Sequence, residues 1–443
     1  MDAVLLSRIQ FGLTAGFHFI FPPLTLGLTL ILLIIEGIFY KTDSPIYEKL
    51  SIFITKILAL IFVMGVATGI VLEFSFGTNW STYSRMVGDI FGAPLAAEGV
   101  FSFFLESVFV GVLVFARKKI SRGAYLASVF LVFFASHLSG LWIIIANSWM
   151  QTPAGYAIEG GRAVLTDFFA AAINHSTLQR YLHTVIGGWI TGSLFASGIA
   201  AWYLLKKRDL EPARALIRIA LITYVVTAIL QFGTGHAHAV QVARTQPAKM
   251  AAFEALWETR TGAPMSVIGL PDPEAKKTRA EIAVPKLLSL AIDFDPEGMV
   301  MGLNEVAADE QPSIVPTYLT YHGMIGLGTL FALTAIVSII LLATRKLYDA
   351  RWFLRLLLLA VPLPFVANEL GWMAAEFGRQ PWAVYGVLRT AEAASVVVPA
   401  WQILLTIIAF SVIFTLIFVM FLKLLANIVR KGPDNVNLGY IGE

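Results

Sequence analysis

Cysteine is absent from this chain of 443 residues. Without thiol groups the protein forms no disulfide, carries no iron–sulfur cluster and binds no haem through a thiolate. Any metal ion that it holds must be ligated by histidine, methionine, carboxylate or hydroxyl groups. The absence narrows the search for functional residues to a few side chain types in an otherwise apolar sequence.

Charged side chains are also scarce, at 14% of the residues, whereas 57% are hydrophobic. A mean hydropathy of +0.75 exceeds what a soluble core needs, so lipid must be the main solvent. The formal net charge of +3 does not indicate nucleic-acid binding, because the basic residues lie in short clusters between apolar runs. The composition predicts a polytopic membrane protein with no nucleic-acid partner.

Nine apolar runs are long enough to cross the roughly 30 Å hydrocarbon layer as helices of about 20 residues. They occupy residues 13–39, 51–74, 94–116, 124–146, 179–205, 213–237, 313–343, 352–374 and 397–427. No internal repeat or low-complexity tract interrupts them. The predicted fold class is therefore an all-α polytopic membrane bundle, with residues 1–443 forming a single integral domain.

Basic residues cluster in alternate connections, at 41–49, 117–122, 206–214, 345–355 and 430–431. By the positive-inside rule these connections face the cytoplasm, which places the N-terminus outside and the C-terminus in the cytoplasm. The N-terminus lacks a basic n-region and a cleavage site, so we expect it to stay uncleaved. The connections at about 75–93, 147–178, 238–312 and 375–396 are then extracytoplasmic. The longest, 238–312, carries charges of both signs and is expected to be solvated.

Four candidate metal ligands lie near the extracytoplasmic ends of their spans. They are His18 in the first span, His183 in the fifth, Met324 in the seventh, and Glu376 just past the end of the eighth. Taken alone, each residue is more typical of a hydrogen-bonded or packing role. The set is informative, because one haem needs a histidine and a methionine from different helices at one level. His183 with Met324 meets that condition.

A carboxylate and a guanidinium lie one turn apart where the eighth span ends, in the run Gly371-Trp372-Met373-Ala374-Ala375-Glu376-Phe377-Gly378-Arg379-Gln380-Pro381-Trp382. Ionisable groups at that depth are costly and usually mark a functional site. The run resembles the GWxxxExGRQPW signature of subunit I of the cytochrome bd quinol oxidases, and the rest of the chain agrees with that family almost from end to end. The resemblance implies that Glu376, Arg379 and Trp372 bind a cofactor.

The resemblance also implies three haems. His183 in Leu182-His183-Thr184 and Met324 in His322-Gly323-Met324 match the ligands of a low-spin haem b. Such a six-coordinate iron has no free position for oxygen, so this haem suits the entry of electrons. His18 and Glu376 match the ligands of a high-spin haem b and of a haem d or further haem b, and the resemblance is compatible with either assignment. Weak or single axial ligation leaves a coordination position free for oxygen.

Two carboxylates, Glu98 and Glu106, lie in the third span, where acids usually serve ion or proton movement. On a regular helix they are about 80° and 12 Å apart, nearly on one face. We expect a relay that brings cytoplasmic protons from Glu106 to Glu98 and on to an oxygen site, with Ser107, Ser139 and Asn147 extending the route through water. The alternative is a structural pair satisfied by neighbouring Ser, Trp or Arg groups.

The segment 246–259 of the long loop resembles the quinol loop of the same family. In that loop a lysine and a glutamate that match Lys249 and Glu254 contribute to quinol oxidation. A carboxylate beside the low-spin haem can accept a quinol proton and release it outside. The alternative is a loop that is merely solvated. The quinol loop lacks the long insertion that some family members carry in its C-terminal part, which places the chain in the short-loop group of the family.

Three positions depart from the family pattern. His322, two residues before the methionine ligand, stands where arginine is common, so the charge near the low-spin haem becomes dependent on pH. His137 stands where asparagine is common, and we expect it to be a hydrogen-bonded residue of the bundle. His236 and His238 open the long loop, where solvated histidines are a better interpretation than a metal pair.

The leading hypothesis is a respiratory quinol oxidase subunit in a bacterial or archaeal cytoplasmic membrane. Quinol is oxidised outside, dioxygen is reduced to water at a high-spin haem pair, and cytoplasmic proton uptake generates a proton-motive force without pumping. The partners are a second integral subunit, subunit II, and single-span subunits in some assemblies. One alternative is a cyanide-insensitive oxidase with only b-type haems. Another is a cofactor-free ion or proton transporter lined by Glu98, Glu106, Glu369 and Glu376.

Overall fold

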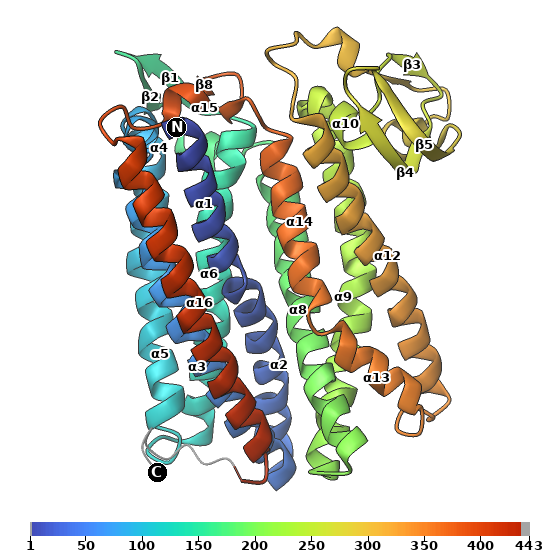
Figure 1. The fold of residues 1–443 in the computed structure, drawn as a ribbon. Helices are drawn as coiled ribbons and strands as arrows, with labels where there is room; N and C mark the ends of the chain where they lie inside the picture. The colour runs from blue at the N-terminus through green and yellow to red at the C-terminus, as the bar shows by residue number, and fades with distance from the viewer. Residues whose placement is uncertain (1, 436–443) are drawn as a thin grey trace.

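The protein folds into a tall bundle of tilted helices, described by a computed structural model over residues 2–435 (Figure 1). Within these residues, nine helical segments are long and apolar enough to cross a membrane. This confirms the number of spans that the sequence predicts. The first residues of α1 (Ala3–Phe19) and the last residues of α16 (Ala400–Lys431) lie at opposite ends of the bundle.

The remaining spans follow in chain order, and three spans consist of more than one helix. Their bounds are α2 (Phe21–Thr42), which continues α1; α3 (Pro45–Gly77); α4 (Ser81–Ala97), η1 (Glu98–Phe103) and α5 (Phe104–Phe115); α6 (Arg122–Gln151); α8 (Thr177–Lys206); α9 (Leu210–Thr245); α12 (Ile314–Ala343); and α13 (Arg351–Ala360) with α14 (Leu363–Phe377).

Several helices extend beyond the bounds that hydropathy predicts. The first begins at Ala3 rather than residue 13, and most of the expected connection 75–93 is helical, because α3 runs to Gly77 and α4 starts at Ser81. The loop predicted at 238–312 likewise begins inside α9, which runs to Thr245. Hydropathy marks the part of a helix that needs lipid, whereas backbone hydrogen bonding continues into its polar ends.

The strands gather at one end of the bundle, which we call the hairpin end (Figure 1). Four antiparallel two-stranded sheets form there: β1 (Tyr156–Glu159) with β2 (Arg162–Leu165), β3 (Arg260–Thr261) with β6 (Met299–Val300), β4 (Met265–Asp272) with β5 (Lys277–Val284), and β7 (Trp382–Val384) with β8 (Leu388–Arg389). Short helices complete it: α7 (Phe168–Ala172), α10 (Pro247–Glu254), α11 (Leu287–Asp293), η2 (Leu303–Glu305) and α15 (Thr390–Ala393).

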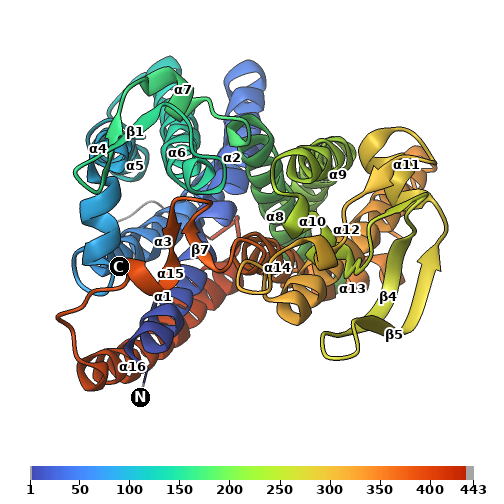
Figure 2. The same cartoon turned by 90° about the horizontal axis from the view of Figure 1, so that it is seen from above.

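Helix α8 lies at the centre of the bundle, as the view from above shows (Figure 2). Its apolar window is 89% buried, against 11% for α16 at the rim. Close approach to α2 depends on glycine, because a Cβ atom at Gly188 would meet the Pro23 carbonyl oxygen and one at Gly192 would meet the backbone of Gly27. Small residues let membrane helices pack backbone to backbone, so this contact fixes the middle of the molecule.

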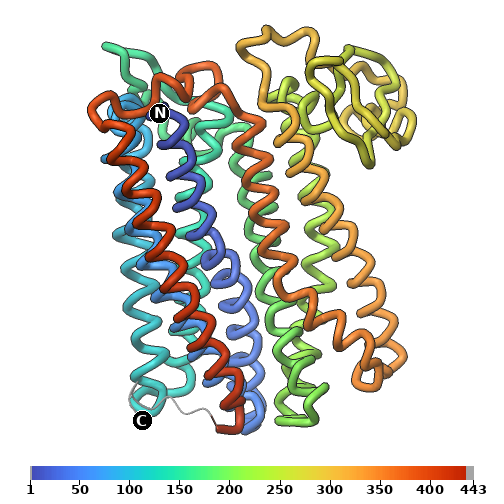
Figure 3. Tube along the Cα trace, viewed as in Figure 1, coloured from blue at the N-terminus to red at the C-terminus, as the bar shows by residue number. Residues whose placement is uncertain are grey.

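The eighth span bends where α13 gives way to α14, as the chain trace shows (Figure 3). Pro362 lies at the break, and proline cannot donate the backbone hydrogen bond that a continuous helix needs. Glu376 was predicted just past the end of this span, but it lies in the last turn of α14. After the bend, α14 runs to the hairpin end and places the Glu376 carboxylate there.

Candidate functional site

His183 and Met324 come from different helices but reach one level of the bundle. Gly187 of α8 faces Asn368 of α14: a Cβ atom on Gly187 would lie 3.1 Å from Asn368 Oδ1. Gly371 of α14 faces Met324: a Cβ atom on Gly371 would lie 2.8 Å from Met324 Sδ. His183 is about 6 Å along α8 from Gly187, and Gly371 about 4.5 Å along α14 from Asn368, both toward the hairpin end. The matched depth that the sequence predicts is therefore consistent with the packing.

Helix α9 lines the other side of the His183 ring. Gln231 Nε2 lies 3.1 Å from His183 Nδ1 and 3.4 Å from its Nε2. A Cβ atom at Gly235 would lie only 3.3 Å from the ring. One ring nitrogen thus has an amide partner, which is how proteins orient a histidine whose other nitrogen binds a metal.

His18 is held in a similar way in the last turn of α1. Its Nδ1 lies 2.9 Å from the Thr68 hydroxyl of α3, and its ring covers Gly69, where a Cβ atom would lie 3.2 Å from Cε1. The hydroxyl fixes one nitrogen and leaves Nε2 available. His18 and His183 therefore share an arrangement in which a polar side chain from a neighbouring helix orients the ring.

Glu376 is the centre of a buried polar cluster. Arg379 forms an ion pair with its Oε2, and Asn147 Nδ2 of α6 donates to Oε1 at 3.0 Å. Arg180 Nη1 of α8 donates in turn to Asn147 Oδ1 at 3.3 Å. A carboxylate offers about four lone-pair sites, so two bonds leave Glu376 with acceptor capacity.

The two arginines of this cluster have donors to spare. Arg180 Nε, Arg379 Nε and Arg379 Nη1 are buried and have no hydrogen-bond partner among the described residues, and each arginine is only 5% exposed. Buried cationic donors without acceptors are costly unless an anion completes them. Sequence reasoning missed Arg180. Its signal was a cation in the first turn of a span, three residues before His183 and so on the same helix face.

Lys249 of α10 lies against the signature run. Its side chain packs on Gly378, where a Cβ atom would be 2.7 Å from Lys249 Cγ, and its ammonium donates to Gln151 of α6 and to Gln246 Oε1 at 2.7 Å. Burial, reinforced by the cations Arg180 and Arg379, holds the pKa of Lys249 well below its ordinary value, against a smaller opposing effect of Glu376. Lys249 thus links the long loop to α6 and to the signature run.

Glu254 ends α10 on the other side, beside α12. It is 4% exposed and accepts a hydrogen bond of 3.1 Å from the Ser266 backbone N–H of β4. Burial raises the pKa of Glu254 to about 8, against a smaller lowering by that bond. The carboxyl is thus protonated at neutral pH and becomes a base only in mildly alkaline conditions. Neither Lys249 nor Glu254 belongs to a merely solvated loop.

The other histidines have definite places. His322 lies between two backbone carbonyls, with Nδ1 3.0 Å from Tyr318 O and Nε2 2.9 Å from Ser266 O. His137 Nε2 accepts from Trp189 Nε1 at 2.9 Å, and its Nδ1 lies 2.6 Å from Phe133 O, which confirms the expected hydrogen-bonded role.

The interpretation of His236 and His238 as loop residues is wrong, although His236 is exposed as expected. Both lie in α9, and His238 packs edge-on against the His183 ring with centroids 5.6 Å apart. Its Nε2 is buried and has no partner among the described residues. His236 packs edge-on against Phe294. In the described range, no group of three or more His, Cys, Asp or Glu side chains could hold a metal ion by itself.

Glu98 and Glu106 are separated by an irregular turn. Glu98 opens the π-helical segment η1 and accepts a hydrogen bond of 2.8 Å from Ser139 Oγ of α6, whereas Glu106 lies in α5 and is 8% exposed. Ser107 donates to the Phe103 carbonyl of its own helix. The angle expected between the two carboxylates assumed an uninterrupted α-helix, and the wider turn alters it. Such turns often occur at functional sites.

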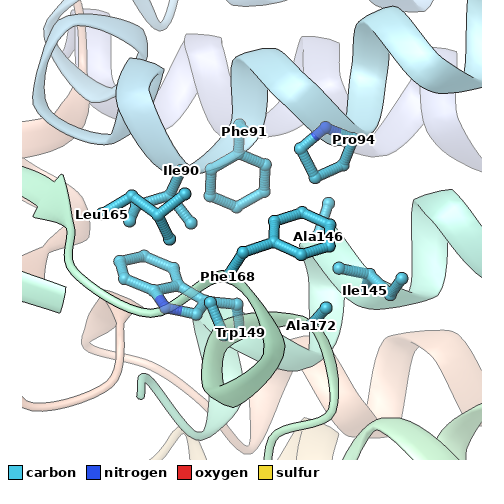
Figure 4. A pocket seen from close by; sticks show the side chains of 10 residues that line it. Ile90, Phe91, Pro94, Ile145, Ala146, Trp149, Leu165, Phe168 and Ala172 are labelled. Carbon is cyan, nitrogen blue, oxygen red and sulfur yellow. The ribbon is translucent and has the colours of Figure 1, made fainter. Parts of the chain in front are cut away.

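A small apolar pocket lies between α4, α6 and α7, next to this region (Figure 4). Phe91, Pro94, Ile145, Ala146 and Trp149 are among its lining residues. Ala146 is the neighbour of Asn147, the partner of Glu376. The lining contains no ionisable side chain, so the pocket is not a place for acid–base chemistry.

Fold and site together define a class, the multi-spanning membrane proteins with ionisable, histidine and methionine side chains buried at one end. Residues 6–433 match the family model described as cytochrome bd terminal oxidase subunit I, and the chain belongs to this family. The chain is therefore part of a quinol:oxygen oxidoreductase of the bacterial inner membrane, a multi-subunit complex with haem cofactors. Membership leaves a cofactor-free transporter without support.

Named relatives agree over nearly the whole chain. The chain is 34% identical to cytochrome bd ubiquinol oxidase subunit 1 of Bacillus subtilis, over 99% of this chain and 96% of the relative. It is 33% identical to cytochrome bd-II ubiquinol oxidase subunit 1 of Escherichia coli, over 98% and 97%. The solved bd oxidase of Geobacillus thermodenitrificans superposes with a TM-score of 0.91 at 26% identity, over 98% and 99%.

Haem fits the residues present. Its propionates are anionic carboxylates, and the unpaired guanidinium donors of Arg180 and Arg379 are the groups that such anions bind bidentately. Imidazole, thioether and carboxylate groups are also the kinds of side chain by which a chain without cysteine could ligate haem iron. Donor chemistry and burial therefore agree with the cofactor class of the family.

Proposed function

We propose that the chain is the subunit that oxidises quinol and reduces dioxygen to water, with the hairpin end outside the cell. His183 and Met324 would hold a low-spin haem b, while His18 and Glu376 would ligate a high-spin haem b and a haem d or further haem b. These groups supply one-electron transfer and a binding position for dioxygen. Arg379, Arg180 and Trp372 would bind and orient them from the protein side.

One observation carries this proposal: the quinol-loop helix α10 contacts both parts of the ligand region. Lys249 packs on Gly378 of the signature run, and Glu254 bonds to Ser266, whose carbonyl lies next to His322, two residues from Met324. A substrate held by α10 would thus lie beside the residues that would ligate the low-spin haem, which accepts electrons when it is bound. The Glu254 carboxylate would take a proton from quinol at its oxygen and pass it to the outer solvent.

Protons for oxygen reduction would travel the other way. Glu106 lies closer to the basic end of the bundle and Glu98 closer to the hairpin end, and Ser139 already holds Glu98. Uptake from the cytoplasm and release outside would generate a voltage without a pump. Subunit II, and single-span subunits in some assemblies, would cover part of the lipid-exposed surface. The same ligand residues would also suit a complex that contains only b-type haems.

A spectrum of the purified complex tests the proposal. Reduced-minus-oxidised absorbance and extracted-haem analysis should report a low-spin b signal together with high-spin haem, and a long-wavelength chlorin band identifies haem d. Met324→Leu keeps the apolar volume and removes the sulfur, so the low-spin signal should become high-spin or vanish. Ile325→Leu is the control, since that neighbour is 42% exposed. An unchanged spectrum in Met324→Leu overturns the ligand assignment.

A further inference from the structure

Glu369 of α14 is a membrane-embedded acid that the proposed function does not use. Its Oε1 is buried without a partner, and no described residue donates a hydrogen bond or forms an ion pair with either carboxylate oxygen. Membrane interiors rarely keep an unpaired acid without a function. By contrast, the buried Glu36 of α2 is satisfied by Ser51 and Arg117.

The position of Glu369 relates it to the oxygen site. It precedes Trp372 by three residues and Glu376 by seven, so the helical period places all three on one face of α14, with Glu369 about 10 Å from Glu376 along the axis. Across from it, a Cβ atom at Gly16 of α1 would lie 3.3 Å from Glu369 Oε2 and 4.0 Å from the Trp372 ring. Gly16 is within about 3 Å of His18 along α1.

Glu369 therefore lies at the level of His18, on the side of Glu376 that faces away from the hairpin end. Protons taken up from the opposite end would pass this level before they reach Glu376. Gly16 and Trp372, which approach each other beside Glu369, do not titrate. A carboxyl group in this place can hold one proton close to where oxygen is reduced.

We propose that Glu369 is a proton-carrying residue of the oxygen site. The carboxyl O–H bond breaks and a new O–H bond forms on an oxygen atom of the substrate, while quinol supplies the electrons. The carboxylate is then reprotonated from the opposite end, so Glu369 is unchanged over a cycle. The inference rests on the proposed function, because it needs oxygen chemistry at His18 and Glu376.

Infrared difference spectroscopy of the purified complex tests this role directly. Light-driven release of carbon monoxide from the reduced complex should perturb the C=O band of a protonated carboxyl group, and the band should shift in D₂O. Glu369→Gln should remove that band, leave the haem absorbance in place, and slow oxygen turnover by roughly a hundredfold, the scale of a lost proton donor. Glu369→Asp should keep a displaced band and part of the turnover.

Two glycine variants of α1 provide a matched pair that keeps the acid. Gly16→Ala places a methyl group against Glu369 Oε2 and should move the carboxyl band with the haem content unchanged. Gly12→Ala, one turn earlier, enters open space and should leave the band where it is. Because both glycine variants keep Glu369, they test whether the carboxyl band comes from Glu369 even if Glu369→Gln loses its haems.

A band that persists in Glu369→Gln, or stays in place in Gly16→Ala, overturns the inference. So does normal turnover of Glu369→Gln with full haem content. Failure of the proposed function looks different, since a wild-type complex without haem would show no carbon monoxide signal at all. A complex that binds haem and reduces oxygen while Glu369 stays silent contradicts this inference alone.

Discussion

The two ends of the bundle are built from different contacts. Away from the hairpin end, large side chains such as Phe53, Ile57 and Leu216 are fully buried in one continuous apolar core. Its most buried ion pair, Arg117 with Glu36, is completed by Ser51, whose hydroxyl lies 2.9 Å from Arg117 Nη1, and the guanidinium covers the Tyr125 ring. Some buried polar atoms of the described residues still lack a partner there, among them Arg117 Nη2 and Thr55 Oγ1.

At the hairpin end, buried polar atoms without partners are concentrated. Among the described residues they include atoms of Arg180, Arg379, His238, Gln231 and Glu369. Proteins violate the rule of satisfied polar groups mainly where a ligand or a reaction completes them. The apolar end thus supplies packing free energy, and the hairpin end holds the larger share of unpaired polar groups.

The largest effect on haem content and turnover should come from replacing an arginine at the hairpin end, and the matching replacement at the opposite end is the control. Arg379→Gln leaves the Glu376 carboxylate buried without its cation, a loss of about 3–5 kcal/mol for such pairs. We expect loss of high-spin haem and at least a hundredfold fall in turnover, read from absorbance and oxygen uptake. Arg117→Gln should lower the melting temperature and preserve the spectrum. Equal haem loss in both variants would remove the distinction between the ends.

The next effect concerns proton delivery between the ends. Glu106→Gln keeps the shape of the side chain but cannot release a proton, so oxygen turnover and the voltage generated in vesicles should fall about tenfold or more. The low-spin haem spectrum should not change. Glu36→Gln is the matched control, an equally buried acid that already has partners. Normal voltage from Glu106→Gln would rule out the route through α5.

Packing at the centre gives a smaller effect on stability. Gly27→Ala forces a methyl group into the backbone of Gly188 and Gly192, which should lower the free energy of unfolding by about 1–3 kcal/mol. Gly37→Ala on the same helix meets open space and should be neutral or stabilising, because alanine favours the helix. Thermal unfolding of the solubilised complex measures both. A haem change in Gly27→Ala would show that the centre also shapes the site.

The smallest effect is a pH dependence at the hairpin end. Because the pKa of Glu254 is raised to about 8, its carboxyl must lose a proton before it can accept one from quinol. Quinol turnover should rise severalfold as pH increases toward 8, and Glu254→Gln should abolish the rise.

The same shift has a consequence for stability. Folded Glu254 retains its proton above its ordinary pKa of 4.5, so its contribution to stability is complete below that pH and is lost as pH rises through about 8. Thermal unfolding of the wild type and Glu254→Gln across this range checks the sign. If quinol turnover instead changes with pH equally in the wild type and in Glu254→Gln, the pH dependence of turnover belongs to another group.

Hydropathy along the chain was enough to predict the nine spans, because lipid exposure acts on each helix separately. The signature run likewise identified Glu376 and Arg379, since a carboxylate and a guanidinium at that depth stand out in one dimension. Helix ends were less well predicted, because polar residues continue α4 and α9 beyond the hydrocarbon layer.

Contacts between helices were decided only by the tertiary structure. Arg180 reaching Asn147, His238 packing on His183 and Lys249 lying on Gly378 each depend on which helices are neighbours, and hydropathy contains no information about neighbours. The π-helical turn at Glu98 is equally a product of packing. Residue types thus determined what chemistry the protein can perform, while helix packing decided which of those residues share a site, because a membrane bundle is specified by side chains that fit across its helices.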